Sequence, residues 1–178
     1  MRHGIAVERN EQSDADFYLD WQRPLTPQGR DSTRAAARGL VAFCPPPDLI
    51  ATSPLLRALQ TAEIVREELK AQWNTKIPLK QWEELKMDHF GGWDGRLKES
   101  KANSVWLVGH EPYLGQFASR KLAPYLSQFA SDTLAPLPDK MQIEFKKAGA
   151  MGLELDLSKG LATLLWMLPP RALRRMAP

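Results

Sequence analysis

Cysteine is nearly absent from this chain of 178 residues, which contains only Cys44. One thiol cannot form an internal disulfide, and no cluster of ligand residues surrounds it, so we interpret Cys44 as a buried structural thiol rather than a metal ligand. Long apolar runs are missing too, because the longest, from Leu161 to Leu168, is interrupted by Thr163 and is far too short to span a bilayer. No secretion signal opens the sequence. We therefore expect a cytoplasmic protein without a membrane segment.

A large net charge is also lacking. The formal charge is +3, and no predicted helix carries a dense basic stripe, which argues against nucleic acid as a partner. The only local basic excess, at Arg171, Arg174 and Arg175, predicts a solvated C-terminal tail. Hydrophobic residues make up 43% and charged residues 25%, as is typical of soluble globular proteins. The length fits a single domain spanning residues 1–178.

Two helix starts can be recognised from their capping residues. Thr26-Pro27 pairs a good N-cap with a proline suited to the first helical position, and the helix should run to about Phe43. Ser53-Pro54 repeats this pattern and predicts a second helix that continues to about Ala71. Residues 5–22 are polar and acidic, which predicts a loop.

Short apolar stretches between these helices predict strands. Buried strands are expected at 48–52 and 104–109, an edge strand at 78–82, and two further strands at 150–155 and 161–168 joined by a turn at 158–160. The segment 87–95, with three glycines and two aromatic residues, predicts a loop. Because strands and helices alternate, we expect an α/β fold, specifically a three-layer α/β/α sandwich with a mainly parallel central sheet.

A local tandem repeat occupies residues 112–135. The segment 112–123 is followed directly by 124–135, and most paired positions are identical. A solenoid needs longer units than this one and more than two of them, so a local duplication is the simplest account. Pro124 at the start of the second copy should break or kink any continuous helix.

Two histidines and two arginines carry the chemistry that the sequence offers. His3 and His110 both occupy predicted strand ends, the usual ligand-binding edge of an α/β sheet. Arg2 adjoins His3, and Arg57 lies in the first turn of the predicted 53–71 helix. Guanidinium groups and a helix N-terminus suit phosphate oxygens, and a neutral imidazole can attack phosphorus. This set predicts a site for a tetrahedral dianion that requires no metal or cofactor.

Four motifs extend the argument: Arg2-His3-Gly4-Ile5-Ala6, the stretch Arg23 to Gly29, the stretch Ser53 to Ala62, and Val108-Gly109-His110-Glu111-Pro112. In this order they resemble the histidine phosphatase superfamily, and Ala6 and the short chain favour its SixA-type phosphohistidine phosphatases. The resemblance implies a phosphoglycerate mutase-like fold. It also implies His3 as the phosphorylated nucleophile, with Arg2, Arg57 and His110 holding the phosphoryl group. The implied partner is a phosphohistidine-containing signalling protein, and we expect the enzyme to be a monomer.

The general acid is not identified by the motifs. Met87 falls about where larger relatives place a Glu, and Asp88, His89 and Glu111 are weaker candidates. A phosphohistidine substrate would tolerate this gap, because its leaving nitrogen needs less help from an acid than an alkoxide does.

The chain before His3 departs from the family pattern. Family members carry several apolar residues there, which form a central strand, whereas only Met1 precedes Arg2 here. We expect a truncated first strand, and either a native protein that starts earlier or a poorly held site with low activity. Two alternatives to the phosphohistidine phosphatase therefore stay open: a small-molecule phosphomonoesterase of the same superfamily, and a phosphate-binding pseudophosphatase.

Overall fold

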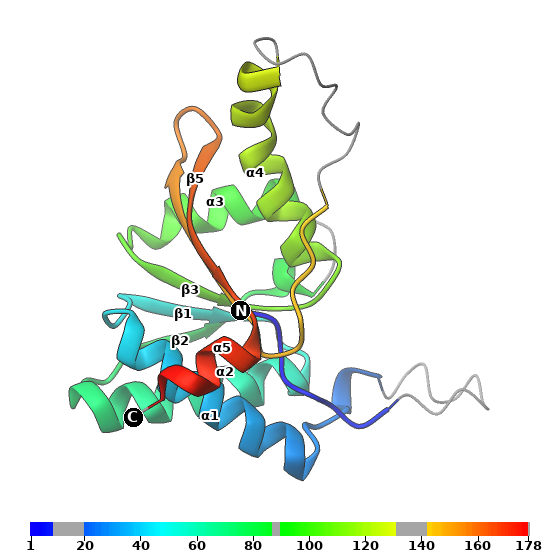
Figure 1. Cartoon of the computed structure of the whole chain (residues 1–178), viewed down its shortest axis with the longest axis vertical. Helices are drawn as coiled ribbons and strands as arrows, with labels where there is room; N and C mark the ends of the chain where they lie inside the picture. Colours follow the sequence, from blue (N-terminus) through cyan, green and yellow to red (C-terminus); the bar gives the residue numbers. More distant parts are fainter. Residues whose placement is uncertain (9–19, 87–89, 131–141, 178) are drawn as a thin grey trace.

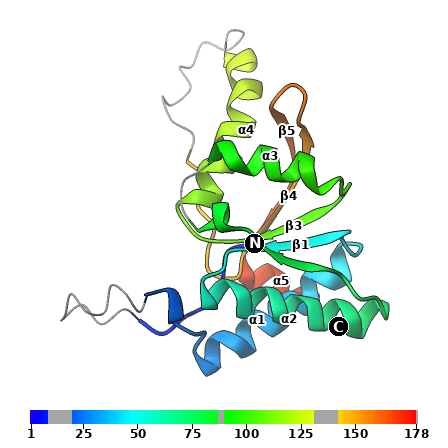
Figure 2. The ribbon, with the colours of Figure 1, turned by 180° about the vertical axis from the view of Figure 1, so that it is seen from behind.

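A parallel sheet between two layers of helices forms the centre of the computed structural model, which describes residues 1–8, 20–86, 90–130 and 142–177. The sheet has the order β2-β1-β3. Helices α1, α2 and α5 lie on one side of it, and α3 and α4 on the other (Figure 1; Figure 2 from behind). The predicted α/β/α fold with a parallel sheet is confirmed. The strands and helices of these layers are β1 (Leu49–Thr52), β2 (Leu79–Gln81), β3 (Val105–Val108), α1 (Pro27–Phe43), α2 (Leu56–Trp73), α3 (Phe90–Ser100), α4 (Tyr113–Ala130) and α5 (Pro170–Met176).

The first helix has the predicted bounds, and the second differs at its start. Thr26 caps α1, its hydroxyl accepting a hydrogen bond from the Gly29 amide at 2.9 Å. The prediction that Ser53-Pro54 begins α2 is wrong, because the N-cap is Leu55 and makes no side-chain cap bond. Ser53 lies before the cap, where its hydroxyl accepts from the Leu55 amide at 3.3 Å and contacts the ring of His110.

The two strands predicted near the C-terminus are present, and they form an antiparallel hairpin that is separate from the parallel sheet. Strand β4 (Ala150–Asp156) pairs with β5 (Leu161–Leu168), with a register shift between Gly152 and Leu153. The hairpin and the parallel sheet meet near the middle of the molecule, where Figure 1 also places the N-terminus.

Residues 1–3 join these two sheets. The first strand is reduced to an isolated parallel bridge between Arg2 and Gly109, in line with the expected truncation. On one side, the His3 amide donates to the Gly109 carbonyl at 3.0 Å, and the Gly109 amide donates to the Met1 carbonyl at 3.1 Å. On the other side, the Arg2 amide donates to the Gly149 carbonyl at 3.0 Å, and the Ala148 amide donates to the Arg2 carbonyl at 3.1 Å. Backbone bonds therefore hold Arg2 and His3 from both sides.

The predicted loop at 87–95 is wrong over its described part, because α3 begins at Phe90. Glycine disfavours helix, but here tertiary packing outweighs propensity. Trp93 is fully buried against Phe117, with ring centroids 4.9 Å apart, and its indole N–H donates to the Glu84 carbonyl at 2.7 Å.

Three further expectations need correction. Helix α4 continues through Pro124, where we expected a break or a kink, so the helix does not break there although a proline removes one helical hydrogen bond. The basic tail is not simply solvated, because it forms α5 with Leu173 fully buried, although Arg171, Arg174 and Arg175 are exposed. Cys44 is half-buried rather than buried, and burial raises its pKa to about 11.

Candidate active site

The two histidines named from the sequence lie together. His3 and His110 are both buried, and their ring centroids are 5.1 Å apart at an angle of 53°. His3 comes from the N-terminal segment and His110 follows the end of β3. The bridge between Arg2 and Gly109 places these residues side by side despite their distance in sequence.

The hydrogen bond of His3 determines which ring nitrogen can react. Its Nδ1 lies 2.7 Å from the carbonyl oxygen of Gly4. A carbonyl oxygen only accepts, so Nδ1 carries the proton of the neutral ring. The lone pair is then on Nε2, which is free to act as a nucleophile. Gly4 is itself fixed, because its amide donates to the Thr61 hydroxyl at 3.0 Å.

His110 is oriented from the start of α2. Its Nε2 lies 2.8 Å from the hydroxyl oxygen of Ser53, which is fully buried. The same oxygen accepts from the Leu55 amide, so its own proton is available to His110 Nε2. In that arrangement His110 Nδ1 carries a proton that can be donated, and this atom is buried with no hydrogen-bond partner in the described part of the chain.

The two arginines bring cationic groups to the same place. Arg2 Nη1 donates to the Phe145 carbonyl at 2.6 Å. Arg57 is 6% exposed, and its Nη1 and Nη2 donate to the backbone carbonyl and the carboxylate of Asp20 at 2.8 and 3.2 Å. The Nε atoms of both arginines are buried and have no hydrogen-bond partner among the described residues.

Burial keeps both histidines neutral. Desolvation lowers the pKa of His3 to about 3, and the charges of Arg57 and Arg2 lower it further against the opposing effect of the Gly4 hydrogen bond. Desolvation also lowers the pKa of His110, as do the neighbouring His3, Arg57 and Arg2. Because both arginines act on both rings, the four residues named from the sequence share one electrostatic environment. That environment has unpaired N–H donors and favours an anion.

Of the general-acid candidates, Glu111 serves as a structural clamp. Its carboxylate accepts from the Phe145 amide at 3.0 Å and from the backbone of Gly115. The carbonyl of Phe145 accepts a hydrogen bond from Arg2, so Glu111 supports Arg2 through the backbone of this one residue. Burial raises the pKa of Glu111. Asp88 and His89 lie outside the described residues.

Three residues of this environment were not identified from the sequence: Ser53 as a partner of His110, Asp20 as a partner of Arg57, and Lys147, whose charge lowers the pKa of His3. Ser53 was interpreted as a helix cap, and its dipeptide pattern could not reveal a long-range contact. Asp20 lies in a stretch rich in acidic residues, where no local pattern distinguishes it from its neighbours. Lys147 lies between the predicted elements, where no helix or strand was expected from the sequence.

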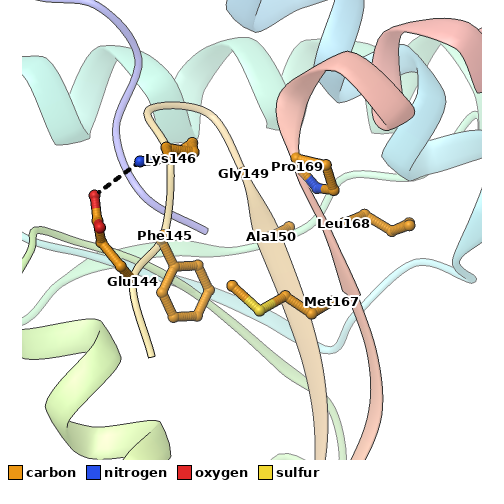
Figure 3. Close-up of a pocket in the computed structure, with 8 residues that line it drawn as sticks. All are labelled: Glu144, Phe145, Lys146, Gly149, Ala150, Met167, Leu168 and Pro169. Carbon is orange, nitrogen blue, oxygen red and sulfur yellow. Dashed lines mark hydrogen bonds and ion pairs between the residues drawn. The ribbon is translucent and has the colours of Figure 1, made fainter. Parts of the chain in front are cut away.

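A cavity of about 230 Å³ lies beside the segment that anchors Arg2. Phe145, Met167 and Leu168 give it apolar walls, and the ion pair between Glu144 and Lys146 lies at one side (Figure 3). None of the two histidines and two arginines lines it. Its only cationic group is already paired with Glu144, so the cavity is a poor place for phosphoryl chemistry. Within the described residues no group of His, Cys, Asp and Glu could hold a metal ion, and no helix is long and apolar enough to cross a membrane.

The family is decided by the N-terminal two thirds of the chain. A model of the histidine phosphatase superfamily (branch 1) matches residues 1–112. The chain belongs to this superfamily. Similar proteins include a phosphatase and a mutase, and this supports the prediction that the chain is an enzyme of phosphatase or mutase type.

Three relatives illustrate the range of similarity. An uncharacterized protein of Picosynechococcus sp. is 38% identical over 119 residues, which cover 66% of this chain and 68% of that protein. A 2,3-bisphosphoglycerate-dependent phosphoglycerate mutase of Thermobifida fusca is 33% identical over 99 residues, 55% of this chain and 37% of the mutase. The protein histidine phosphatase SixA, solved in complex with tungstate, is 26% identical with a TM-score of 0.72, covering 96% of this chain and 95% of that chain. The SixA-type resemblance predicted from the motifs is confirmed.

Proposed function

We propose that this protein is a phosphohistidine phosphatase that dephosphorylates a phosphohistidine-containing protein through a phospho-His3 intermediate. One observation carries the proposal. Three buried nitrogen atoms, from Arg2, Arg57 and His110, have no hydrogen-bond partner within residues 1–8, 20–86, 90–130 and 142–177, and they share the environment of a neutral His3 whose Nε2 carries the lone pair. Buried donors without acceptors are costly, and a phosphoryl group would satisfy them.

The chemistry follows from the state of each group. The Nε2 lone pair of His3 attacks phosphorus, a new P–N bond forms, and the P–N bond to the substrate imidazole breaks. The substrate nitrogen leaves with the electron pair and takes a proton from the solvent, which the attacking water molecule gives back in the second step. A water oxygen then attacks the phosphorus of phospho-His3, the P–Nε2 bond breaks, and inorganic phosphate leaves while His3 returns to its neutral form. Arg2, Arg57 and His110 offset the charge on the transferring group in both steps.

Two features support phosphohistidine as the substrate. The likeness to SixA has a TM-score of 0.72 and 26% identity over almost the whole of both chains. In addition, Glu111, the one described candidate for a general acid, is held by backbone amides, and a phosphohistidine substrate depends least on such an acid.

A rapid-quench experiment tests the intermediate. After brief exposure to a ³²P-labelled phosphohistidine domain, the wild-type enzyme should carry acid-labile phosphate, and the His3→Asn variant should carry none. Turnover by the wild type without such a labelled species would exclude the covalent mechanism. Oxyanion binding without turnover would instead favour the pseudophosphatase.

The similarity to the phosphoglycerate mutase favours a second candidate, a phosphatase for small phosphate esters. The two candidates are separated by kcat/KM for a phosphohistidine domain and for sugar phosphates measured on the same preparation. A higher kcat/KM for the esters would replace the phosphohistidine assignment and leave the role of His3 intact.

A further inference from the structure

Arg57 is held by a residue outside the four that the motifs identified. Both of its Nη atoms donate to Asp20, at 2.8 Å to the backbone carbonyl and 3.2 Å to Oδ2. Oδ1 of the same carboxylate accepts from Arg23 Nε at 2.7 Å, and Arg23 Nη1 donates to the Val7 carbonyl at 2.9 Å. Asp20 therefore lies between two guanidinium groups, and one of them is anchored to the segment that follows His3.

We propose that Asp20 is a positioning residue, which fixes the guanidinium of Arg57 so that its unpaired Nε and remaining N–H groups face the phosphoryl group. The proposal rests on the proposed function, because it gives Arg57 the task of binding that group.

Burial explains why Arg57 needs such a partner. A side chain that is 8% exposed cannot keep its charge hydrated, and an unpaired buried cation is strongly destabilising. Asp20 is the only partner that the structure gives Arg57 among the described residues. Two bonds to one residue also fix the direction of the planar fork, which a single bond would leave free to rotate.

The charges of Asp20, Arg23 and Arg57 are consistent with a carboxylate that stays bound to Arg57. Desolvation raises the pKa of Asp20, but the charges of Arg57 and Arg23 outweigh it, so the net pKa lies below the ordinary value and the carboxylate stays ionised. Arg23 and Arg57 repel each other, and the carboxylate between them offsets this repulsion. When a phosphoryl dianion enters, the positive charges of Arg2, Arg23 and Arg57 would equal the negative charges of the dianion and Asp20.

The alternative is that Asp20 occupies the place of the phosphate and must be displaced. The unpaired Nε of Arg57 argues against this, because it leaves a donor available while Asp20 is bound. The two possibilities make opposite predictions for oxyanion affinity. A positioning residue strengthens the binding of an oxyanion, and a competing carboxylate weakens it.

The test compares Asp20→Asn with wild type, using tungstate affinity by calorimetry and kcat/KM on a phosphohistidine domain. We expect both to fall by about 10- to 100-fold. Asp31→Asn, an exposed carboxylate on α1, is the matched control and should change neither. A gain in tungstate affinity for Asp20→Asn would overturn the proposal and identify a competing anion.

A double-mutant cycle with Arg57→Ala separates positioning from a general structural effect. If Asp20 acts through Arg57, adding Asp20→Asn to Arg57→Ala should change tungstate affinity and kcat/KM less than about twofold. The proposal would be refuted if Asp20→Asn lowered tungstate affinity and kcat/KM as much in the Arg57→Ala background as it does in the wild type. A wild-type enzyme that binds tungstate but hydrolyses nothing would refute the proposed function, and the affinities would still decide the role of Asp20. Absence of tungstate binding would overturn both.

Discussion

At the scale of single residues, Gly4 gives the site its geometry. Its carbonyl accepts the proton of His3 Nδ1, and its amide is bound to Thr61. A Cβ atom at this position would collide with the Thr33 hydroxyl oxygen and approach the Gly29 carbonyl oxygen to 3.3 Å. The glycine is therefore required by close approach rather than by an unusual backbone angle.

Gly4→Ala should lower both stability and activity. We expect the free energy of unfolding to fall by about 1–3 kcal/mol, because the new methyl group overpacks the contact with α1. The catalytic rate should fall as well, since a displaced Gly4 carbonyl no longer fixes the His3 ring. Gly95→Ala is the control, because its Cβ would meet nothing within 4 Å on helix α3, and alanine should be neutral or slightly stabilising there. Urea denaturation and steady-state kinetics measure both effects, and a Gly4→Ala enzyme with wild-type values would contradict the packing argument.

The protonation state of His3 predicts the acid limit of activity. An ordinary histidine loses its nucleophilic form below about pH 6.5. Desolvation lowers the pKa of His3 to about 3, so the free enzyme should keep its neutral nucleophile well below that pH. A pH profile of kcat/KM, with the titration of the substrate measured separately, should show no enzyme-derived loss centred near pH 6.5. Such a loss would show that His3 is more hydrated in solution than this structure indicates.

At the scale of elements, helices and strands were predicted correctly from local sequence patterns where neighbouring residues in the chain determine the secondary structure. The cap at Thr26, the proline at position 27 and the apolar runs of β1, β3 and β5 were all recognisable from the sequence, since each depends on neighbours in the chain. Helix α3 was missed because its glycines disfavour helix and its stability depends on Trp93, whose partners are distant in sequence. The same limit applies to the site. His3, His110, Arg2 and Arg57 follow motifs, whereas Asp20 was visible only through its contacts.

Trp93→Ala should therefore destabilise the protein through α3. Removing a fully buried tryptophan with a satisfied indole N–H is expected to cost about 3–5 kcal/mol. Trp73→Ala is the comparison, since Trp73 is 46% exposed at the end of α2 and should cost clearly less. Chemical denaturation of both variants tests this order. Equal losses would mean that α3 contributes little to the stability of the fold.

At the scale of the whole molecule, the buried histidines couple stability to pH. Both have folded-state pKa values below the ordinary 6.5, so below that pH the unfolded chain binds more protons than the folded one. Above about pH 6.5 the two histidines are neutral in both states and do not lower the free energy of unfolding. Below that pH the free energy of unfolding falls as the pH drops toward the folded pKa values. The slope is about 1.4 kcal/mol per pH unit for each histidine.

The slope can be measured by urea denaturation between about pH 7 and about pH 5, a range that avoids most carboxylate titration. His110→Gln removes one titrating group and should reduce the slope below about pH 6.5 by about 1.4 kcal/mol per pH unit, whatever its effect on stability at neutral pH. The remaining slope comes from His3 and from the buried amino group of Met1, whose pKa is lowered by desolvation to about 5. An unchanged slope would show that His110 is not excluded from protonation in the folded state.

The bonds that hold Arg2 also set the order in which the protein can become active. Arg2 donates to the carbonyl of Phe145, 143 residues later in the chain, and its neighbour His3 is bonded to Gly109. During synthesis His3, the proposed nucleophile, leaves the ribosome long before any of these partners has been made. Neither His3 nor Arg2 is held in its final position until the segment before β4 has emerged from the ribosome. Catalytic activity would thus be acquired late in biosynthesis, and an incomplete chain would not act on its substrate.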